Sequence, residues 1–111
     1  MSELLNRRRI MSNALAPAAT DSFTFAASYF VIDSVTFWFP PPTGFDRVRL
    51  DLDGVTLLAA NAPLGTLNDT VVIYRPQIVC FGSDSITVTN QGADVIGYSV
   101  SGFFAAQPGS Y

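Results

Sequence analysis

Residues 47–59 read RVRLDLDGVTLLA, and this stretch decides the fold class. Apolar and polar side chains alternate on both sides of Asp53-Gly54, a pair that favours a two-residue type I′ turn because both residues tolerate positive φ. Folding the chain at that turn forms three apolar pairs on one face, which are Leu52 with Val55, Leu50 with Leu57, and Val48 with Ala59. A one-residue slip would mix the two faces. The stretch therefore predicts a β-hairpin with this register.

The acidic residues near this hairpin are the best candidates for carboxylate chemistry. Paired carboxylates can serve glycoside hydrolysis, and oxygen ligands from Asp46, Asp51 or Asp53 suit a calcium ion. The hairpin explains two of them structurally: we expect Asp51 to be solvated on the polar face and Asp53 to form the turn. We prefer this structural interpretation and predict neither a catalytic nor a metal site here.

The pattern continues on both sides of the hairpin. Residues 22–25, 34–39, 85–89 and 96–101 alternate with period two, which is typical of half-buried strands. Residues 29–32, 71–74 and 78–81 are apolar on both faces, which suits central strands or strands covered by another subunit.

Turn-forming residues separate these segments at intervals of roughly 8–12 residues, and no strong helix signal intervenes. We predict an all-β fold, a seven- to eight-stranded antiparallel β-sandwich with an N-terminal extended arm. A jelly roll is the first choice and an immunoglobulin-like sandwich the second.

The N-terminal segment differs in charge from the rest of the chain. Residues 1–9 hold three Arg and one Glu, a net charge of +2, whereas residues 10–111 hold three Arg and eight Asp, a net charge of −5. We predict a basic arm over residues 1–20 and a β-sandwich domain over residues 21–111. The arginines followed by residues 10–19 resemble a twin-arginine signal, but Ser12, Asn13 and Pro17 make that segment too polar. We expect no signal peptide.

Composition excludes several classes of function. The chain has no histidine and all six of its basic residues are arginine, so the usual general bases and nucleophile activators are missing. Cys80 is the only cysteine, which rules out an intrachain disulfide and a cysteine metal site; its apolar surroundings predict a buried thiol. No glycine-rich phosphate loop occurs. We expect no enzyme, no cofactor, no bound metal and no small-molecule ligand.

Charge and hydropathy point to protein partners. The isoelectric point is about 4.4, which argues against a broad nucleic-acid-binding face, and no stretch reaches the roughly 18 apolar residues of a membrane span. Hydrophobic residues make up 49% of the chain and charged residues 14%, against roughly 25% charged in an average soluble domain. Part of the apolar excess must lie at the surface, which favours a homo-oligomer.

Two places are candidates for partner contacts, the arm and an outward-facing tryptophan. The arginine cluster can pair with acidic protein surfaces, contact nucleic acid weakly, or be merely solvated. Alternation in residues 37–39 directs Trp38 away from the core, where its own loop, a protein interface or a sugar could cover it. The candidate partner-binding residues are Leu4, Leu5, Arg7, Arg8, Arg9, Ile10 and Trp38.

Residues 82–90, GSDSITVTN, and 97–103, GYSVSGF, are similar to C-terminal strands of phage virion proteins. With the arm and the sandwich, the chain resembles small tailed-bacteriophage virion structural proteins, most closely head decoration (cement) proteins. The resemblance implies a non-enzymatic capsid subunit, often trimeric, that binds a major capsid protein on the outer surface of the virion and is made in the host cytoplasm. The alternatives are a receptor- or carbohydrate-binding module of a tail or adhesin, and a ring subunit of the tail or neck. No site residue is carried over from the family.

Overall fold

The computed structural model describes residues 7–26, 29–41, 43–62 and 68–104, and in these ranges the chain forms strands and turns only. The strands are β1 (Arg7–Leu15), β2 (Thr20–Thr24), β3 (Phe30–Phe39), β4 (Arg47–Leu52), β5 (Val55–Asn61), β6 (Thr70–Tyr74), β7 (Ile78–Cys80), β8 (Ser85–Asn90) and β9 (Ile96–Phe104).

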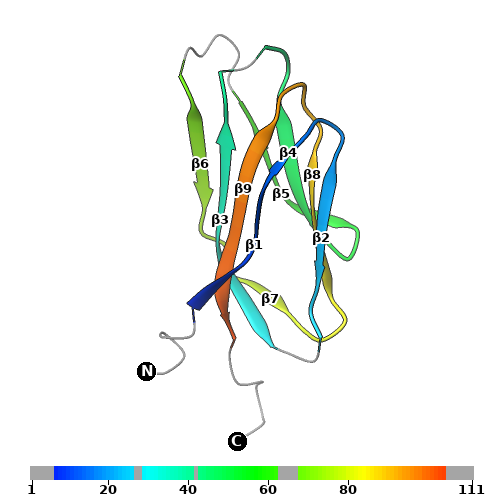
Figure 1. Cartoon of the computed structure of the whole chain (residues 1–111). Coiled ribbons are helices and arrows are strands. Elements are labelled where there is room, and N and C mark those ends of the chain that lie inside the picture. Colours follow the sequence, from blue (N-terminus) through cyan, green and yellow to red (C-terminus); the bar gives the residue numbers. More distant parts are fainter. Residues whose placement is uncertain (1–6, 27–28, 42, 63–67, 105–111) are drawn as a thin grey trace, which may run out of the picture.

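Two antiparallel sheets pack face to face (Figure 1). The front sheet has the order β1-β9-β3-β6, with β7 also paired to β3, and the back sheet has the order β2-β8-β4-β5. Strands β6 and β7 pair with successive parts of β3 on either side of residues 75–77, so together they fill one strand position.

The pairing order identifies the sandwich as a jelly roll. With β6 and β7 taken as one position, the chain forms four nested antiparallel pairs: β1 with β9, β2 with β8, β3 with β6, and β4 with β5. This nested ribbon, wound across two sheets, is the jelly-roll arrangement. The predicted all-β antiparallel sandwich is confirmed, with its first-choice topology.

The core lies between the sheets and follows the predicted alternation. In β9, Ile96, Tyr98 and Val100 are buried and the residues between them face outward. In β3, Phe37 and Phe39 are buried whereas Trp38 is exposed, as the sequence predicted. Cys80 is also buried, in β7.

The β4–β5 hairpin confirms the predicted turn but corrects the register. Asp53 and Gly54 have φ of 49° and 85°, as a type I′ turn requires, and Leu52 pairs with Val55. A bulge between Leu50 and Asp51 then shifts the pairing by one residue. The predicted pairs of Leu50 with Leu57 and Val48 with Ala59 are therefore wrong, and the pairs formed are Leu50 with Leu58 and Val48 with Ala60.

The prediction of a solvated Asp51 is also wrong. Asp51 is buried, accepts a hydrogen bond from Thr56 Oγ1 at 2.6 Å, and forms an ion pair with Arg49 Nε at 3.2 Å. A buried carboxylate needs such partners, and Thr56 is its direct cross-strand neighbour on the turn side of the bulge. Asp53 lies in the exposed turn, as predicted, and accepts a hydrogen bond from the Ser85 N–H.

The segment that we expected to be an arm is, over Arg7–Leu15, strand β1 of the front sheet. It is extended, as predicted, but it pairs with β9 along its length, and Met11 and Leu15 belong to the core. The buried Asn90 side chain donates a hydrogen bond to the Leu15 carbonyl at 2.9 Å. The sandwich therefore begins before residue 21, because apolar side chains of this segment complete the core.

Candidate protein-binding face

Several exposed apolar side chains lie together on the outer surface of the front sheet, near the β6 edge. Trp38 of β3, Val71 and Ile73 of β6, and Val95 in the loop before β9 are 43%, 50%, 51% and 54% exposed. Trp38 is the direct partner of Val71, and Ile73 pairs with Thr36 of β3. We call these four residues the apolar face. Small polar side chains of β3 and β9 adjoin it, and the other exposed large apolar side chains belong to other segments: Phe45, Val55, Leu57, Val79 and Phe81.

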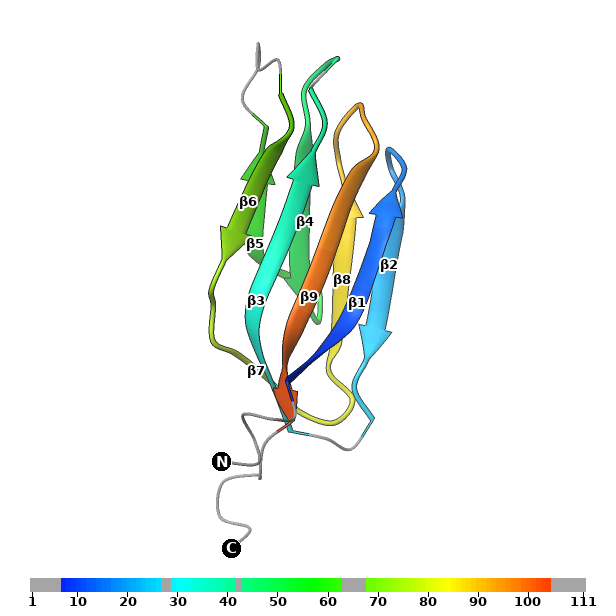
Figure 2. The ribbon, with the colours of Figure 1, turned by 60° about the vertical axis from the view of Figure 1, so that its left-hand side comes forward.

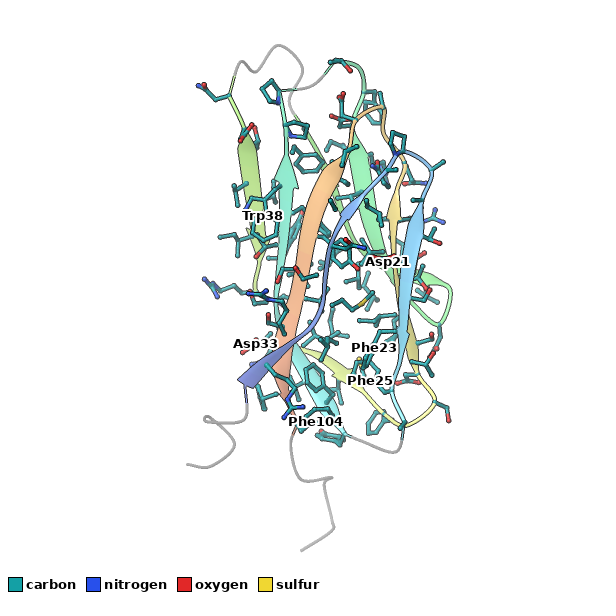
Figure 3. The ribbon with its side chains drawn as sticks, viewed as in Figure 1. Asp21, Phe23, Phe25, Asp33, Trp38 and Phe104 are labelled. Atoms are coloured by element: carbon teal, nitrogen blue, oxygen red, sulfur yellow. The ribbon has the colours of Figure 1, made fainter. Side chains whose placement is uncertain are left out.

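The indole of Trp38 lies against the backbone of β9. Trp38 and Gly97 are partners in the β3–β9 register, and a Cβ at Gly97 would be 3.3 Å from Trp38 Cε3. Because Gly97 has no side chain, the ring can lie close to the sheet. The exposed part of the ring is thus presented by a fixed strand, on the outer surface of the front sheet (Figure 3).

A shallow pocket adjoins the tryptophan. It has a volume of about 220 Å³ and is lined by Trp38, Phe39, Pro40, Asp69 and Val95. Its walls are mostly apolar, with a single carboxylate at the side. Such a site fits an apolar side chain of a partner protein, or a sugar ring stacked on the indole with a hydroxyl on Asp69.

Two carboxyl groups hold the loops that support this pocket. Asp46 Oδ1 accepts hydrogen bonds from the N–H groups of Ala93 and Asp94, both at 2.9 Å. Asp94 in turn accepts from the Thr43 hydroxyl at 2.6 Å and the Thr43 N–H at 2.9 Å. These bonds join residues 43–46, before β4, to residues 93–94, before β9. Val95 follows directly, so the wall of the pocket is anchored to buried polar contacts.

The two carboxyl groups have opposite pKa shifts. Burial raises the pKa of Asp46, whereas the hydrogen bonds from Thr43 lower the pKa of Asp94. Asp46 Oδ2 is buried and has no hydrogen-bond partner in the described chain. Burial and the neighbouring charge of Asp94 both raise the pKa of Asp46 and so favour its protonated form.

The predicted basic residues lie at the other end of the same sheet. Arg8 and Arg9 are exposed on β1, and the Arg8 guanidinium carbon lies 5.1 Å from the centre of the Phe104 ring. Arg8 pairs with Gly102, which is five residues along β9 from Gly97. At about 3.3 Å per strand residue this places the arginines roughly 17 Å from Trp38 along the sheet.

The remaining predicted partner residues are divided between the core and the ends of the chain. Ile10 is partly buried and packs against the core. Arg7 begins β1, and its side chain lies outside the described structure, as do Leu4 and Leu5. Of the candidates, Trp38, Arg8 and Arg9 are therefore the exposed ones, and the fold does not bring Trp38 together with the arginines.

Sequence reasoning missed Val71 and Ile73 as surface residues. The run 71–74 is apolar on both faces, which suggested either a central strand or a strand covered by another subunit. In the structure β6 is at the edge of the front sheet, so the central position is wrong. The edge position of β6 could have been recognised from the charged residues that flank this apolar run.

The acidic residues considered for calcium are not brought together. Asp46 precedes β4 and Asp53 follows it, so the strand separates them. Among the described residues, no group of three or more His, Cys, Asp or Glu side chains is arranged to hold a metal ion. No helix in the described ranges is long and apolar enough to cross a membrane.

Comparisons with known proteins support the fold. No protein-family model and no curated protein matches the sequence. A solved structure of the Drosophila NLP core, described in relation to pentamer formation and histone binding, is similar with a TM-score of 0.56 and 13% identity, over 89% of this chain and 100% of that one. At this identity the similarity concerns the fold alone.

Two further structures are more distant. The carbohydrate-binding module CBM36, in complex with calcium and xylotriose, has a TM-score of 0.47 and 15% identity over 89% of this chain and 98% of that one. The virus-like particle of extra small virus from the giant freshwater prawn Macrobrachium rosenbergii has a TM-score of 0.41 and 13% identity over 91% and 79%.

Proposed function

We propose that this chain is a non-enzymatic structural protein that binds partner proteins through the apolar face of the front sheet. The observation that carries the proposal is the exposure of Trp38, Val71, Ile73 and Val95 on one surface. An exposed apolar patch on a sheet surface usually marks a contact with a partner.

The energetics suit a protein interface. Complete burial of a large apolar side chain contributes about 1.5–3 kcal/mol, so covering these half-exposed residues contributes about 1 kcal/mol each. Trp38 is the natural anchor, because tryptophan is enriched among the residues that dominate interface energies. It rests on Gly97 and therefore has little freedom to lose when a partner binds.

In its more specific form, the proposal is a decoration subunit on the outer surface of a phage capsid. The resemblance of residues 82–90 and 97–103, which now lie along β8 and β9, to phage virion strands supports this role. The exposed Arg8 and Arg9 would then pair with acidic groups of a major capsid protein. Self-association would accompany capsid binding, and the subunit would be made in the host cytoplasm before it joins the virion.

Co-sedimentation with empty capsid shells of the phage that carries the gene tests this role. The wild-type chain should pellet with the shells, and Trp38→Asp should lower its affinity by about tenfold or more, because an anchor is lost and a charge is introduced. Thr20→Asp on β2, at the opposite edge of the other sheet, is the matched control. Equal binding of wild type and Trp38→Asp would refute the role of the apolar face.

The basic end of β1 requires a separate variant. Removing residues 2–16 would delete β1 and part of the core, so charge reversal is the cleaner test. Arg8→Glu combined with Arg9→Glu should weaken capsid binding, most clearly at low salt, because screened surface pairs lose strength as ionic strength rises. Binding that is unchanged at every salt concentration would exclude the arginines from the contact.

The pocket beside Trp38 supports a second candidate, a carbohydrate-binding module. An exposed indole next to the Asp69 carboxylate is the kind of site that stacks a sugar ring and fixes a hydroxyl. In that case Trp38→Ala should abolish binding on a glycan array while the assembly of the protein is unchanged. A wild-type chain that binds no glycan on the array excludes this candidate.

A further inference from the structure

Strand β6 is an exposed edge with an unusual charge pattern. It ends the front sheet beside β3, and no described strand pairs with its other side. Figure 2 shows β6 at one margin of the sandwich, next to β5 of the back sheet. An edge strand offers unpaired backbone N–H and C=O groups, which natural proteins usually protect with internal charges, proline or a covering segment. Thr70–Tyr74 contains neither charge nor proline.

The outward side chains of this edge are arranged so that they complement a second, antiparallel copy of themselves. Asp69, Val71, Ile73 and Arg75 alternate along the strand and its two flanking residues, and all four are exposed. An acidic residue stands at one end, a basic residue at the other, and two β-branched residues lie between them. Neither Asp69 nor Arg75 has an ion-pair partner within the described chain.

We propose that two copies of this chain pair edge to edge through β6, antiparallel about a two-fold axis at Val72. In that register Asp69 of one copy lies opposite Arg75 of the other, twice by symmetry. Val71 lies opposite Ile73, also twice, and outward residues meet outward residues because directly opposed positions share a face. The front sheets of the two copies become one continuous sheet, and a single isologous contact closes the pair.

The edge is held in a fixed position before any partner arrives. Val72 and Tyr74 face inward and pack against the core. The Tyr74 hydroxyl donates a hydrogen bond to the Ala59 carbonyl of β5 at 2.9 Å, so β6 is tied to the back sheet. A strand that is already ordered loses little conformational entropy on pairing, which favours association.

The other edge strands do not have this self-complementarity. The described edges are β1, β2, β5, β6 and β7, with β7 at the same edge as β6. Strand β1 carries only basic charges, β2 carries a single Asp, and β5 and β7 carry no charge. Only β6, with its flanking residues, places opposite charges at equal distances from its centre. The partner that fits the β6 edge is therefore a second copy of this chain. The contact is two-fold, whereas the resemblance to phage proteins implied trimers.

This inference rests on the proposed assembly role and makes the self-contact specific. Sedimentation equilibrium of the full chain provides the test. Wild type should show a monomer–dimer equilibrium, and Asp69→Arg and Arg75→Asp should each weaken it by about tenfold or more, because like charges then face each other twice. Ile73→Lys should abolish it, since a central lysine blocks edge pairing. Thr20→Lys on the opposite edge strand β2 should leave it unchanged.

The two charge variants also test the register. An equimolar mixture of Asp69→Arg and Arg75→Asp should regain dimers, because each position then faces an opposite charge on the other chain. The double variant should associate like wild type. Failure of the mixture to associate, or dimers that are insensitive to both reversals, would overturn the pairing, as would a wild type that stays monomeric.

The outcomes separate this inference from the proposed function. A monomeric chain that still co-sediments with capsid shells rejects β6 pairing and keeps the decoration role. A chain that dimerises with the predicted charge dependence, yet binds no shells, keeps β6 pairing and rejects decoration. Circular dichroism of each variant verifies that a lost signal does not come from unfolding.

Discussion

Asp46 Oδ1 accepts a hydrogen bond from the Asp94 N–H at 2.9 Å, which joins the segment before β4 to the loop before β9. Burial raises the pKa of Asp46, whereas the hydrogen bonds from Thr43 lower the pKa of Asp94. The contact supports Val95 and hence one wall of the pocket beside Trp38. A pair of acids therefore controls the geometry of the candidate binding face.

This pair predicts a specific pH dependence of stability. Because the pKa of Asp46 is raised above its ordinary value of 3.8, the folded state holds the proton more tightly than the unfolded state. The stabilisation is present at low pH and is lost as pH rises from that value through the raised pKa. Asp94, with a lowered pKa, contributes stability that is lost as pH falls. Together, the two shifts make the folded state most stable at pH values between the two pKa values.

Asp46→Asn should remove the loss at higher pH. The amide can accept the same two N–H bonds through its oxygen and has no proton to release. Urea denaturation of both proteins between about pH 4 and pH 8 should show the variant gaining relative stability as pH rises. Parallel stability curves would contradict the raised pKa of Asp46, and Asp46→Ala, which cannot accept the two N–H bonds, should be less stable than either.

Glycine substitutions on β9 should differ sharply in effect. A Cβ at Gly102 would lie 1.9 Å from the Val31 carbonyl oxygen, so Gly102→Ala forces the backbone apart and should cost about 3 kcal/mol or more. At Gly97 the nearest atom to the added carbon is Trp38 Cε3 at 3.3 Å, and this ring can move outward, so Gly97→Ala should cost at most about 1 kcal/mol.

Tryptophan fluorescence follows the Gly97 change directly, since Trp38 is the only tryptophan. Its emission should shift to the red in Gly97→Ala as the ring becomes more solvated. Thermal melts of both variants measure the stability difference. Equal destabilisation of the two would contradict the close backbone approach at Gly102.

Cys80 should be protected from thiol reagents until the protein unfolds. Burial raises the pKa of this thiol from 9.0 to about 12, and the thiolate is the reactive form. Alkylation by iodoacetamide at about pH 8 should be slower than in the urea-unfolded chain by orders of magnitude. The raised pKa also predicts that stability falls as pH rises from 9 toward 12, since the unfolded chain releases this proton first. Similar labelling rates in the folded and unfolded chains would contradict the burial.

Asp51 should matter for stability in spite of its place beside an exposed turn. Asp51→Ala leaves Arg49 without its ion-pair partner and Thr56 without its acceptor, and should cost about 1–3 kcal/mol. The matched control is Asp53→Asn, which can keep the turn and the bond from Ser85 and should cost little. Equal denaturation midpoints for wild type and Asp51→Ala would refute the role of the buried carboxylate.

Features that depend on near neighbours were predictable from the sequence. The Asp53-Gly54 turn forms because both residues accept positive φ, and the outward Trp38 between buried Phe37 and Phe39 follows from the period of two in a strand. The arginines and the tryptophan were recognised as exposed candidates for the same reason. Their separation along the sheet was not predictable, since it depends on which strands pair.

The features that were missed involve contacts between distant residues. The bulge in the β4–β5 pairing and the burial of Asp51 depend on contacts between strands, and the place of β1 in the sandwich depends on how Met11 and Leu15 fit the core. The edge position of β6 was missed because an apolar run such as 71–74 is equally expected in a central strand. An apolar run shows that its side chains must be covered, but it does not show which segment or subunit covers them.

The sequence by itself therefore determined the strands, the main turn, the antiparallel sandwich with its jelly-roll preference, and the surplus of apolar surface. These follow from local periodicity and from turn chemistry, which act within a few residues. Only the tertiary structure decided that Asp46 meets Asp94, that β1 closes the front sheet, and that Asp69, Val71, Ile73 and Arg75 line a free edge. Those outcomes depend on which strands pair, and these strands lie far apart in the chain. A local sequence pattern does not encode that pairing order.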